Sequence, residues 1–543
     1  MSRTDSADRQ EDYDLIVIGA GINGAGIARD AALRGLRVLL VERSDIGGAT
    51  SAWNSRLIHG GLRYLEHGEI GLVRESLRER EVLLRTAPHL VQPLPLLVPL
   101  YRDARRSRRL VHLGMLAYDV LSYDKSLPWH RRYSARQLRR LEPGLNRDGL
   151  LGAALYHDAQ APFPERLVLE NVLDARALGA DVRTYTRARR VLIEDFTHRA
   201  RGVELETPAG TIEQAYADAV INVAGPWVDE LLGASGNGFE RRIGGTKGTH
   251  IVVDPFPGAP RHALYAEAAA DGRPYFTIPW NGRYLIGTTD TRYEADPGEA
   301  APEDAEIDYL LAETNRLLPE AGLRRADVLS AYAGVRPLPH AEAGTTAAIT
   351  RRHVIVDHAP QAEGLWSVVG GKLTTYRHLA EEAVTQVGHR LDWQLPASGT
   401  RSRPLPGAAG EPWRELRRRF EARHQLPPEL AERLVGLYGT RAEAIARRMR
   451  TDPELGEVFS PATGAIAAEL VHAFEAEAAQ TLADALLRRT MVGLGPEAGL
   501  DALDGAARIA ERWLGWDPER IEDEREGYLA EIARLHPRAL AGG

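Results

Sequence analysis

Three glycines near the start of the chain have the spacing of a dinucleotide-binding turn. Gly19, Gly21 and Gly24 lie between a β-branched run at 13–18 and a helical pattern at 22–34. The first glycine permits a tight turn, the second lets a pyrophosphate approach the backbone, and the third lets helix and strand pack closely. The helix N-terminus then offers N–H groups and a partial positive charge to phosphates. These residues therefore predict a site for a dinucleotide.

An acidic residue follows at the distance that this motif requires. Residues 36–42 predict a second strand, and Glu42 stands at its end. A carboxylate there can accept hydrogen bonds from ribose hydroxyls, and its charge would repel a 2′-phosphate, which favours FAD or NAD over NADP. The segments 43–51 and 54–64 that follow are polar and rich in glycine. They suit an extended dinucleotide whose far ring lies deep in the protein, which favours FAD.

The elements around these residues indicate a mixed α/β protein. Strands are predicted from short apolar runs at 219–223, 250–253, 284–288 and 366–369. A linker rich in Pro, Gly and Ala is predicted at 396–412. Helical patterns follow it at 413–424, 428–438, 440–450, 463–489, 501–515 and 523–535.

The expected fold class is a Rossmann-like FAD-binding domain with an interleaved mixed α+β substrate domain and a C-terminal all-helical domain. The predicted order is a polar tail at 1–12, the two interleaved domains at 13–395, the linker at 396–412, and the helical domain at 413–543.

Composition excludes several other classes of protein. The 543 residues carry a net charge of −8, which argues against a nucleic-acid partner, and contain no cysteine. The missing cysteines rule out disulfides, iron–sulfur ligation and a cysteinyl flavin on this chain. No metal-ligand spacing is found. No signal peptide and no apolar run of about 18 residues are visible, so we expect a cytoplasmic protein, either free or on the inner face of the cytoplasmic membrane.

Eight segments, in their order along the chain, resemble the FAD-dependent glycerol-3-phosphate dehydrogenase family. They are IVIGAGINGAGIARDAALRGLRVLLVE (16–42), SRLIHGGLRYLEHGEIGLV (55–73), EREVLLRTAPHL (79–90), NVAGPWV (222–228), KGTHIVV (247–253), LIGTTD (285–290), AGVRPL (333–338) and GGKLTTYR (370–377). The segment ADALLRRTMVGLG (483–495) resembles the family's C-terminal helical domain. The resemblance implies the aerobic, respiratory type of enzyme. Such an enzyme oxidises sn-glycerol 3-phosphate to dihydroxyacetone phosphate by hydride transfer from C2 to flavin N5, with quinone as acceptor.

Two other functions stay open beside this one. The sister glycerophosphate oxidases share most of these segments and use oxygen as the acceptor. A flavin-binding sensor or scaffold without turnover is the second alternative.

Three segments depart from the family's pattern. The Ser-Lys that precedes LIHGG in the family is Ser55-Arg56 here, after Trp53 and Asn54. The usual Asp-Ala-Arg-Leu is replaced by Pro164-Glu165-Arg166-Leu167. The family's NATGPW turn reads NVAGPW, which removes a threonine hydroxyl at Ala224.

The resemblance also indicates site residues. Arginine suits a phosphate because its planar fork makes permanently charged, bidentate hydrogen bonds. Arg63 and Arg336 are therefore the predicted phosphate ligands, and Tyr64 and Lys247 are predicted to line the substrate site. The predicted contacts of FAD are Gly19, Gly21, Asn23, Gly24, Glu42, Thr50, Ser51, Ser55, Leu57, His59, Gly60, Gly61, Ala224, Gly225, Gly371, Lys372, Leu373 and Thr374.

Three residues are candidates for catalysis. His59 and His250 are the leading proton acceptors because imidazole titrates near neutrality. Either could instead be structural, and proton loss to water would leave both without that role. Lys372 follows a Gly-Gly turn that leads into a helix, and its charge would stabilise an anionic reduced flavin.

Two basic, partly apolar segments bear on membrane contact. Residues 94–122 and 413–424 combine apolar side chains with several arginines. Such segments can lie on anionic membranes. Packing against the protein's own core is the alternative for each. A homodimer is a further predicted assembly.

Overall fold

The computed structural model describes residues 12–66, 68–236, 238–340, 349–408 and 413–535. The predicted tail at 1–12 lies outside these residues, except for Asp12. The chain divides into two compact units, each assembled from three stretches of sequence. Unit 1 comprises residues 1–48, 168–245 and 336–403, and unit 2 comprises residues 49–167, 246–335 and 404–543. The domain boundaries at 395/396 and 412/413 stay predictions.

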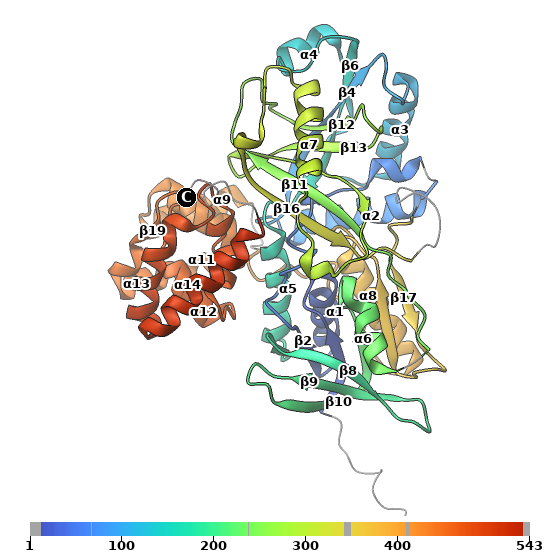
Figure 1. The fold of residues 1–543 in the computed structure, drawn as a ribbon, viewed down its shortest axis with the longest axis vertical. Helices are drawn as coiled ribbons and strands as arrows, with labels where there is room; N and C mark the ends of the chain where they lie inside the picture. Colours follow the sequence, from blue (N-terminus) through green and yellow to red (C-terminus); the bar gives the residue numbers. More distant parts are fainter. Residues whose placement is uncertain (1–11, 67, 237, 341–348, 409–412, 536–543) are drawn as a thin grey trace, which may run out of the picture. The chain divides into compact units, whose positions relative to one another are not determined.

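A largely parallel sheet forms the centre of unit 1 (Figure 1). Its strand order is β17 (Val354–Asp357), β18 (Leu365–Val369), β10 (Ile212–Asn222), β1 (Tyr13–Ile18), β2 (Val38–Val41) and β7 (Asp181–Arg183). β9 (Ala200–Glu206) joins β10, and β8 (Arg187–Ile193) joins β9, both antiparallel. Within the sheet β1 lies between β2 and β10, with Leu15 opposite Val38 and Ala219. All three of these side chains are buried, as expected for a central parallel strand. The Rossmann-like prediction is confirmed.

The helices of unit 1 pack closely because small residues line their contacts. α1 (Ile22–Leu33) lies against α8 (Tyr376–Arg390) (Figure 1). A Cβ atom on Gly26 of α1 would lie 2.8 Å from the ring of Tyr376. The same unit contains the short helix α6 (Val228–Ser235).

A second, mixed sheet organises unit 2. Its strand order is β15 (Thr291–Arg292), β11 (Thr246–Val253), β14 (Arg283–Gly287), β13 (Pro274–Trp280), β12 (Ala263–Glu267), β4 (Gln92–Tyr101), β6 (Leu150–Gln160) and β3 (Leu57–Ile58). β16 (Val328–Arg336) pairs with β11, and β5 (Arg131–Ser134) pairs with β6. The sheet is accompanied by α2 (Ile70–Thr86), α3 (Arg108–Leu121), α4 (Ala135–Leu141) and α7 (Asp304–Leu317). The first turn of α5 (Pro164–Ala177) also belongs to unit 2. The predicted mixed α+β character of this part is confirmed.

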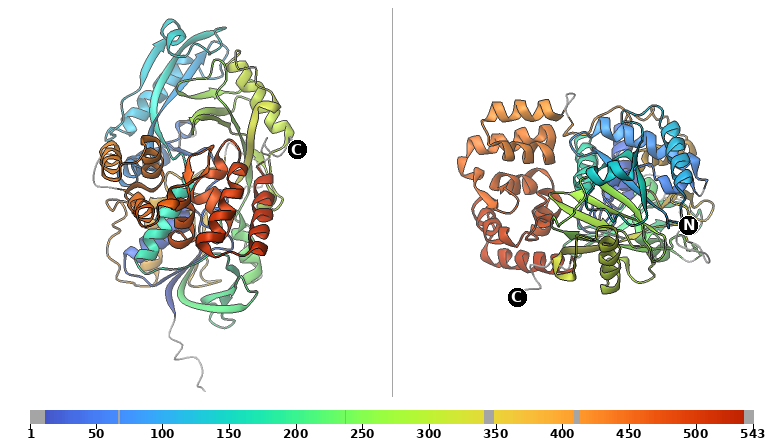
Figure 2. Two further views of the ribbon diagram at one scale, coloured as in Figure 1. Left: turned by 90° about the vertical axis from the view of Figure 1, so that its left-hand side faces the viewer. Right: turned by 90° about the horizontal axis from the view of Figure 1, so that it is seen from above.

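The end of the chain is predominantly helical, as predicted (Figure 2). Its helices are α9 (Trp413–His424), α10 (Pro428–Tyr438), α11 (Ala442–Thr451), α12 (Ala467–Ala476), α13 (Leu503–Leu514) and α14 (Pro518–Ala533). In α9 the side chains of Leu416 and Phe420 are buried in the helical core, so this apolar face is not available to a membrane. No helix in the described part of the chain is both long enough and apolar enough to cross a membrane.

The prediction of one helix over 463–489 is wrong. A short hairpin of β19 (Val458–Ser460) and β20 (Ala465–Ile466) precedes α12, which ends at Ala476. A π-helical turn then covers Asp484–Arg489. Between these helices Glu477 is fully buried in an ion pair and Ala478 has a left-handed φ of +56°. The tertiary ion pair thus ends a helix that the apolar periodicity alone would continue.

The predicted linker is fixed to unit 1 over its first half. Arg377 donates a hydrogen bond of 3.0 Å to the buried hydroxyl of Thr400. Arg403 lies 3.1 Å from a carboxylate oxygen of Asp174. Residues 409–412 lie outside the described part of the chain.

Gly439 provides a test of close packing in the helical part. It has a φ of +57°, and a Cβ atom there would lie 1.8 Å from the backbone oxygen of Gly407. Gly464 has a similar φ of +71° but no atom within 4 Å of the added Cβ. We expect Gly439→Ala to lower the melting temperature more than Gly464→Ala. Both changes add backbone strain of about 1–2 kcal/mol, but only the first also forces neighbouring backbone apart, which costs about 1–3 kcal/mol. Equal shifts by circular dichroism would contradict this.

Candidate active site

The glycine-rich turn of unit 1 joins β1 to α1. Gly19 has a left-handed φ of +106°, and a Cβ atom there would lie 2.6 Å from the oxygen of Val223. A Cβ atom on Gly24 would lie 1.8 Å from the oxygen of Gly19. Gly21 precedes α1, whose first turn contains no acidic residue and no capping side chain. The positive end of the helix can therefore attract an anion at this turn.

Glu42 is fixed beside the same turn. Its Oε2 accepts a hydrogen bond of 2.8 Å from the backbone N–H of Ala20. Its Oε1 accepts hydrogen bonds from the backbone N–H and the hydroxyl of Ser44, at 3.0 Å and 3.1 Å. Each carboxylate oxygen has two lone pairs, so Oε2, which accepts one hydrogen bond here, can accept a second one from a ribose hydroxyl of a dinucleotide.

A distant segment meets the first helix of this site. The side-chain amide of Asn23 donates a hydrogen bond of 3.3 Å to the oxygen of Gly370. Gly371 has a φ of +98°, and a Cβ atom there would lie 2.6 Å from the same amide nitrogen. Asn23 Oδ1 is buried and accepts no hydrogen bond within the described residues. Lys372, Leu373 and Thr374 continue from this contact toward the start of α8, and Thr374 is buried.

The turn after β10 lies on the other side of Gly19. A Cβ atom on Gly19 would lie 3.2 Å from Cα of Ala224. Asn222 holds this turn, because its Oδ1 accepts a hydrogen bond of 3.2 Å from the backbone N–H of Ala224. Gly225 follows with a φ of +60°. A close-packed glycine turn, a positive helix end, an oriented carboxylate and an orphaned amide oxygen fit the diphosphate and ribose of FAD.

The remaining predicted FAD residues lie in unit 2, in the segment that contains Thr50, Ser51, Ser55, Leu57, His59, Gly60 and Gly61. The hydroxyl of Thr50 donates a hydrogen bond of 2.7 Å to the oxygen of Val335. The N–H of Gly60 donates a hydrogen bond of 2.9 Å to the hydroxyl of Tyr118. That hydroxyl donates to Asp158 Oδ2 at 2.7 Å, and Asp158 pairs with Arg80. The sequence analysis did not identify Tyr118 and Asp158, because no motif at either position predicts that it supports the loop of Gly60.

His250 and Ser55, both predicted site residues, are in direct contact. His250 Nε2 lies 2.9 Å from Ser55 Oγ. The imidazole stacks on the ring of Tyr332, with centroids 5.0 Å apart and an interplanar angle of 23°. Gly287, opposite His250 on β14, leaves room for that imidazole, since a Cβ atom there would lie 2.3 Å from it. The hydroxyl of Tyr332 donates a hydrogen bond of 2.8 Å to the oxygen of Asn54. Tyr332 was missed, although it directly precedes the AGVRPL segment.

The predicted cations differ in their surroundings. Lys247 Nζ lies 3.0 Å from Glu306 and also pairs with Glu303. Burial opposes its charged form, yet the two carboxylates outweigh burial and raise the pKa of Lys247. Arg63, in contrast, is half-buried and forms no ion pair within the described residues. Arg336 ends β16 and belongs to unit 1.

The remaining predicted residues of unit 2 are His59, which directly precedes Gly60, and Tyr64, which contacts Gly61. The rings of His59 and Phe276 meet edge to face, with centroids 6.5 Å apart. The ring of Tyr64 packs directly on Gly61, where a Cβ atom would lie 2.0 Å from it.

Arg56 and Glu165, which both depart from the family's pattern, form an ion pair in the structure. Arg56 donates hydrogen bonds of 3.1 Å and 3.0 Å to the two carboxylate oxygens of Glu165. The side chains are 0% and 1% exposed. Arg56 also lies over the ring of Trp280, 4.6 Å from its centroid. The positive charge at 56 and the negative charge at 165 therefore form one buried pair.

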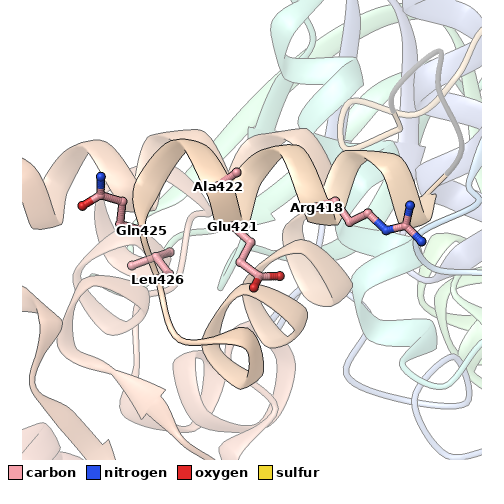
Figure 3. A pocket seen from close by; sticks show the side chains of 5 residues that line it. All are labelled: Arg418, Glu421, Ala422, Gln425 and Leu426. Carbon is pink, nitrogen blue, oxygen red and sulfur yellow. The ribbon is translucent and has the colours of Figure 1, made fainter.

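Other features of the described residues add nothing to this site. A hollow of 450 Å³ on α9 and the turn after it is lined by Arg418, Glu421, Ala422, Gln425 and Leu426, none of them predicted site residues (Figure 3). No three His, Cys, Asp or Glu side chains converge as metal ligands in the part of the chain that the structure describes.

Gly24 provides a test of the proposed FAD turn. We expect Gly24→Ala to raise the Kd for FAD at least about tenfold, because forcing backbone apart costs about 1.4 kcal/mol or more. Gly233→Ala in α6 is the matched control, since its Cβ atom would meet no atom within 4 Å. Quenching of FAD fluorescence on reconstitution gives both affinities. Wild-type affinity in Gly24→Ala would place FAD elsewhere.

Comparison with known proteins agrees with this geometry. Residues 14–377 match the FAD dependent oxidoreductase family, and residues 398–521 match the C-terminal domain of alpha-glycerophosphate oxidase. The chain is 46% identical to a glycerol-3-phosphate dehydrogenase of Synechocystis sp., with 95% of each chain covered. It is 38% identical to the aerobic glycerol-3-phosphate dehydrogenase of Escherichia coli, covering 94% of this chain and 99% of that one. The crystal structure of the Bacillus halodurans glycerol-3-phosphate dehydrogenase complexed with FAD is similar, with a TM-score of 0.78, 28% identity, and 97% and 95% of the two chains covered. The chain therefore belongs to the FAD dependent oxidoreductase family and, within it, to the FAD-dependent glycerol-3-phosphate dehydrogenases.

Proposed function

We propose that this chain oxidises sn-glycerol 3-phosphate to dihydroxyacetone phosphate, with His250 as the proton acceptor. The hydrogen bond between His250 and Ser55 carries this assignment. It places the hydroxyl of Ser55 2.9 Å from Nε2, so this nitrogen faces a hydroxyl within the distance that proton transfer to an imidazole requires. Stacking on Tyr332 fixes the plane of the ring. Bound FAD would supply the redox chemistry by accepting the hydride from C2.

Arg63 is the proposed ligand of the substrate phosphate. It is the predicted substrate cation of unit 2 whose charge no carboxylate offsets within the described residues, whereas Lys247 is held by Glu303 and Glu306. A guanidinium without a carboxylate partner can donate two parallel hydrogen bonds to a phosphate. Lys247 is therefore left out of the proposed phosphate site. Arg336 and Tyr64 stay predictions, as does the role of Lys372 beside the flavin.

We also propose quinone as the electron acceptor. The two relatives from Synechocystis sp. and Escherichia coli are named dehydrogenases and not oxidases, which supports quinone over oxygen as the acceptor. An exposed apolar surface on α3, described below, gives a second reason, since a lipid-soluble acceptor is met at a membrane.

An anaerobic titration with sn-glycerol 3-phosphate tests substrate and acceptor together. We expect the substrate to bleach the flavin absorbance of the FAD-loaded protein, and a quinone analogue to restore it faster than oxygen does. Faster recovery with oxygen would indicate an oxidase. A flavin that the substrate leaves oxidised would contradict the substrate assignment and favour a sensor or scaffold.

The role of Arg63 is tested in the same assay. We expect Arg63→Ala to raise the substrate concentration for half-maximal bleaching about 30-fold, because one charged hydrogen-bonded contact contributes about 2 kcal/mol. Arg63→Lys restores part of the affinity, and dithionite reduces all variants alike. Arg78→Ala, which changes an exposed arginine of α2, is the control. Equal affinities in the Arg63 and Arg78 variants would remove Arg63 from the site.

We propose further that α3 is the surface through which the protein contacts the cytoplasmic membrane from its inner face. Within the segment 94–122, the apolar residues of β4 are largely buried in the sheet, whereas α3 exposes an apolar stripe. The stripe consists of Leu110, Leu113, Leu116 and Val120, which are 52%, 65%, 48% and 56% exposed. Tyr123 and Trp129 follow it and are also exposed. Exposed arginines precede and follow the stripe in the sequence, at 102, 105, 108, 109, 131 and 132.

The positive charge of the nearby arginines favours an anionic partner for this stripe. Apolar residues with an aromatic and arginine border match an anionic lipid surface. A second copy of the chain would bring the same arginines against each other, which opposes pairing of this face with itself.

Vesicle binding tests the stripe. We expect the protein to sediment with vesicles of phosphatidylcholine and phosphatidylglycerol, less at high salt, and little with phosphatidylcholine alone. Leu113→Asp should weaken binding at least about tenfold, since burying one leucine contributes about 1.5–3 kcal/mol. Phe196→Asp, at a residue 98% exposed in unit 1, is the control and should bind like wild type. If Leu113→Asp instead dissociates a dimer and leaves vesicle binding unchanged, the stripe is a contact between copies.

A further inference from the structure

We propose that Glu165 and Arg166 are positioning residues through which the C-terminal helices fix the loop of Asn54, Ser55 and Arg56. This inference rests on the proposed function, because that loop holds Ser55 against His250. All of the residues involved belong to unit 2. Two adjacent side chains at the start of α5 point in different directions and make two separate buried ion pairs.

The first of these pairs ties α5 to the loop. Glu165 accepts both hydrogen bonds of the Arg56 fork, in a place where neither side chain is more than 1% exposed. The oxygen of Pro162 accepts a hydrogen bond of 2.9 Å from Arg56 and one of 2.8 Å from the indole of Trp280. The chain just before α5 is thus pinned to Arg56 by backbone as well as by charge.

Arg56 in turn shapes the residues that precede it. It is a non-glycine residue with a left-handed φ of +57°. Its backbone N–H donates a hydrogen bond of 2.7 Å to the side chain of Asn54. The backbone oxygen of Asn54 accepts a hydrogen bond from the hydroxyl of Tyr332. The next residue, Ser55, contacts His250. A displacement of Arg56 therefore changes the geometry at His250 Nε2.

The second pair ties α5 to the C-terminal helices. Arg166 donates a hydrogen bond of 2.9 Å to Glu477 Oε1, and both side chains are 0% exposed. It also donates to the oxygen of Leu437 at 3.1 Å and lies 4.5 Å from the centroid of the Tyr438 ring. Burial opposes the charge of Glu477, but Arg166 and Arg441 outweigh burial and lower its pKa to about 2. Glu477 is therefore ionised at neutral pH and holds Arg166.

The two pairs act together because their members are consecutive in one helical turn. A buried arginine that loses its carboxylate must move toward water or another acceptor, since an unpaired buried charge is strongly unfavourable. Movement of Arg166 rotates the first turn of α5 and carries Glu165 with it. The helical part of the chain thus acts on the proton-accepting site from a distance.

The test compares Glu477→Gln and Glu165→Gln with Glu142→Gln in the FAD-loaded full chain. Glu142 is also buried in unit 2, where it accepts hydrogen bonds of 2.9 Å and 3.0 Å from the backbone N–H groups of Arg261 and His262. We expect both glutamine variants to slow flavin reduction by saturating sn-glycerol 3-phosphate about fivefold or more, with little change in KM. The combined variant should be slower by less than the product of the two effects, because both act on the same turn. Glu165→Asp should recover most of the rate, and Glu142→Gln should leave it unchanged.

Hydrogen exchange supplies a readout besides activity. We expect amide exchange in residues 54–58 to rise at least threefold in Glu477→Gln, and not in Glu142→Gln. If Glu477→Gln lowers the melting temperature but changes neither the reduction rate nor exchange at 54–58, the proposal is wrong. If substrate fails to reduce even the wild-type flavin, the proposed function falls, whereas the exchange measurement still decides whether the helices fix the loop.

Discussion

Unit 2 depends on one buried ion pair, between Arg56 and Glu165. Burying an ion alone costs several kcal/mol, so Arg56 and Glu165 must stay in bidentate contact for the surrounding segments to fold as they do. The contact continues into backbone pairing, because Leu57 lies opposite Gln160 and the N–H of Ala161 donates to the oxygen of Arg56. The register of the loop against β6, and the start of α5, follow from this one interaction.

Unit 1 positions its share of the predicted FAD residues by close packing of the backbone and not by a buried ion pair. There the backbone itself makes the site: Gly19, Gly24 and Gly371 lie where a Cβ atom would meet a neighbour within 2.6 Å. Charge enters through the end of α1 and through Glu42, whose carboxylate is anchored by the turn that it faces. Close backbone approach suits the invariant diphosphate of a cofactor, whereas side-chain networks such as those around His250 can be adapted to a substrate.

The helix α3 combines two roles on opposite faces. Its buried face contributes Tyr118, whose hydroxyl supports the N–H of Gly60 and is held by Asp158. Its outer face exposes the leucine stripe. The apolar pattern of this segment therefore has two separate causes, a core contact for Met115 and Tyr118 and an open surface for Leu113 and Leu116. Periodicity alone does not separate them.

What the sequence determined by itself is local or carried by resemblance. The turn at Gly19 to Gly24, its flanking strand and helix, and the helices at 413–424 and 428–438 could be predicted, because their signals lie in neighbouring residues. The sequence also marked His250 and Ser55 as site residues, and it marked Arg56 and Glu165 as departures from the family's pattern. Only the tertiary structure decided that these residues form pairs, that Lys247 is held by carboxylates, and that Glu477 interrupts a helical pattern. The reason is physical: backbone preferences act between residues close in sequence, whereas the contact of two side chains 109 or 311 positions apart depends on how the whole chain is folded.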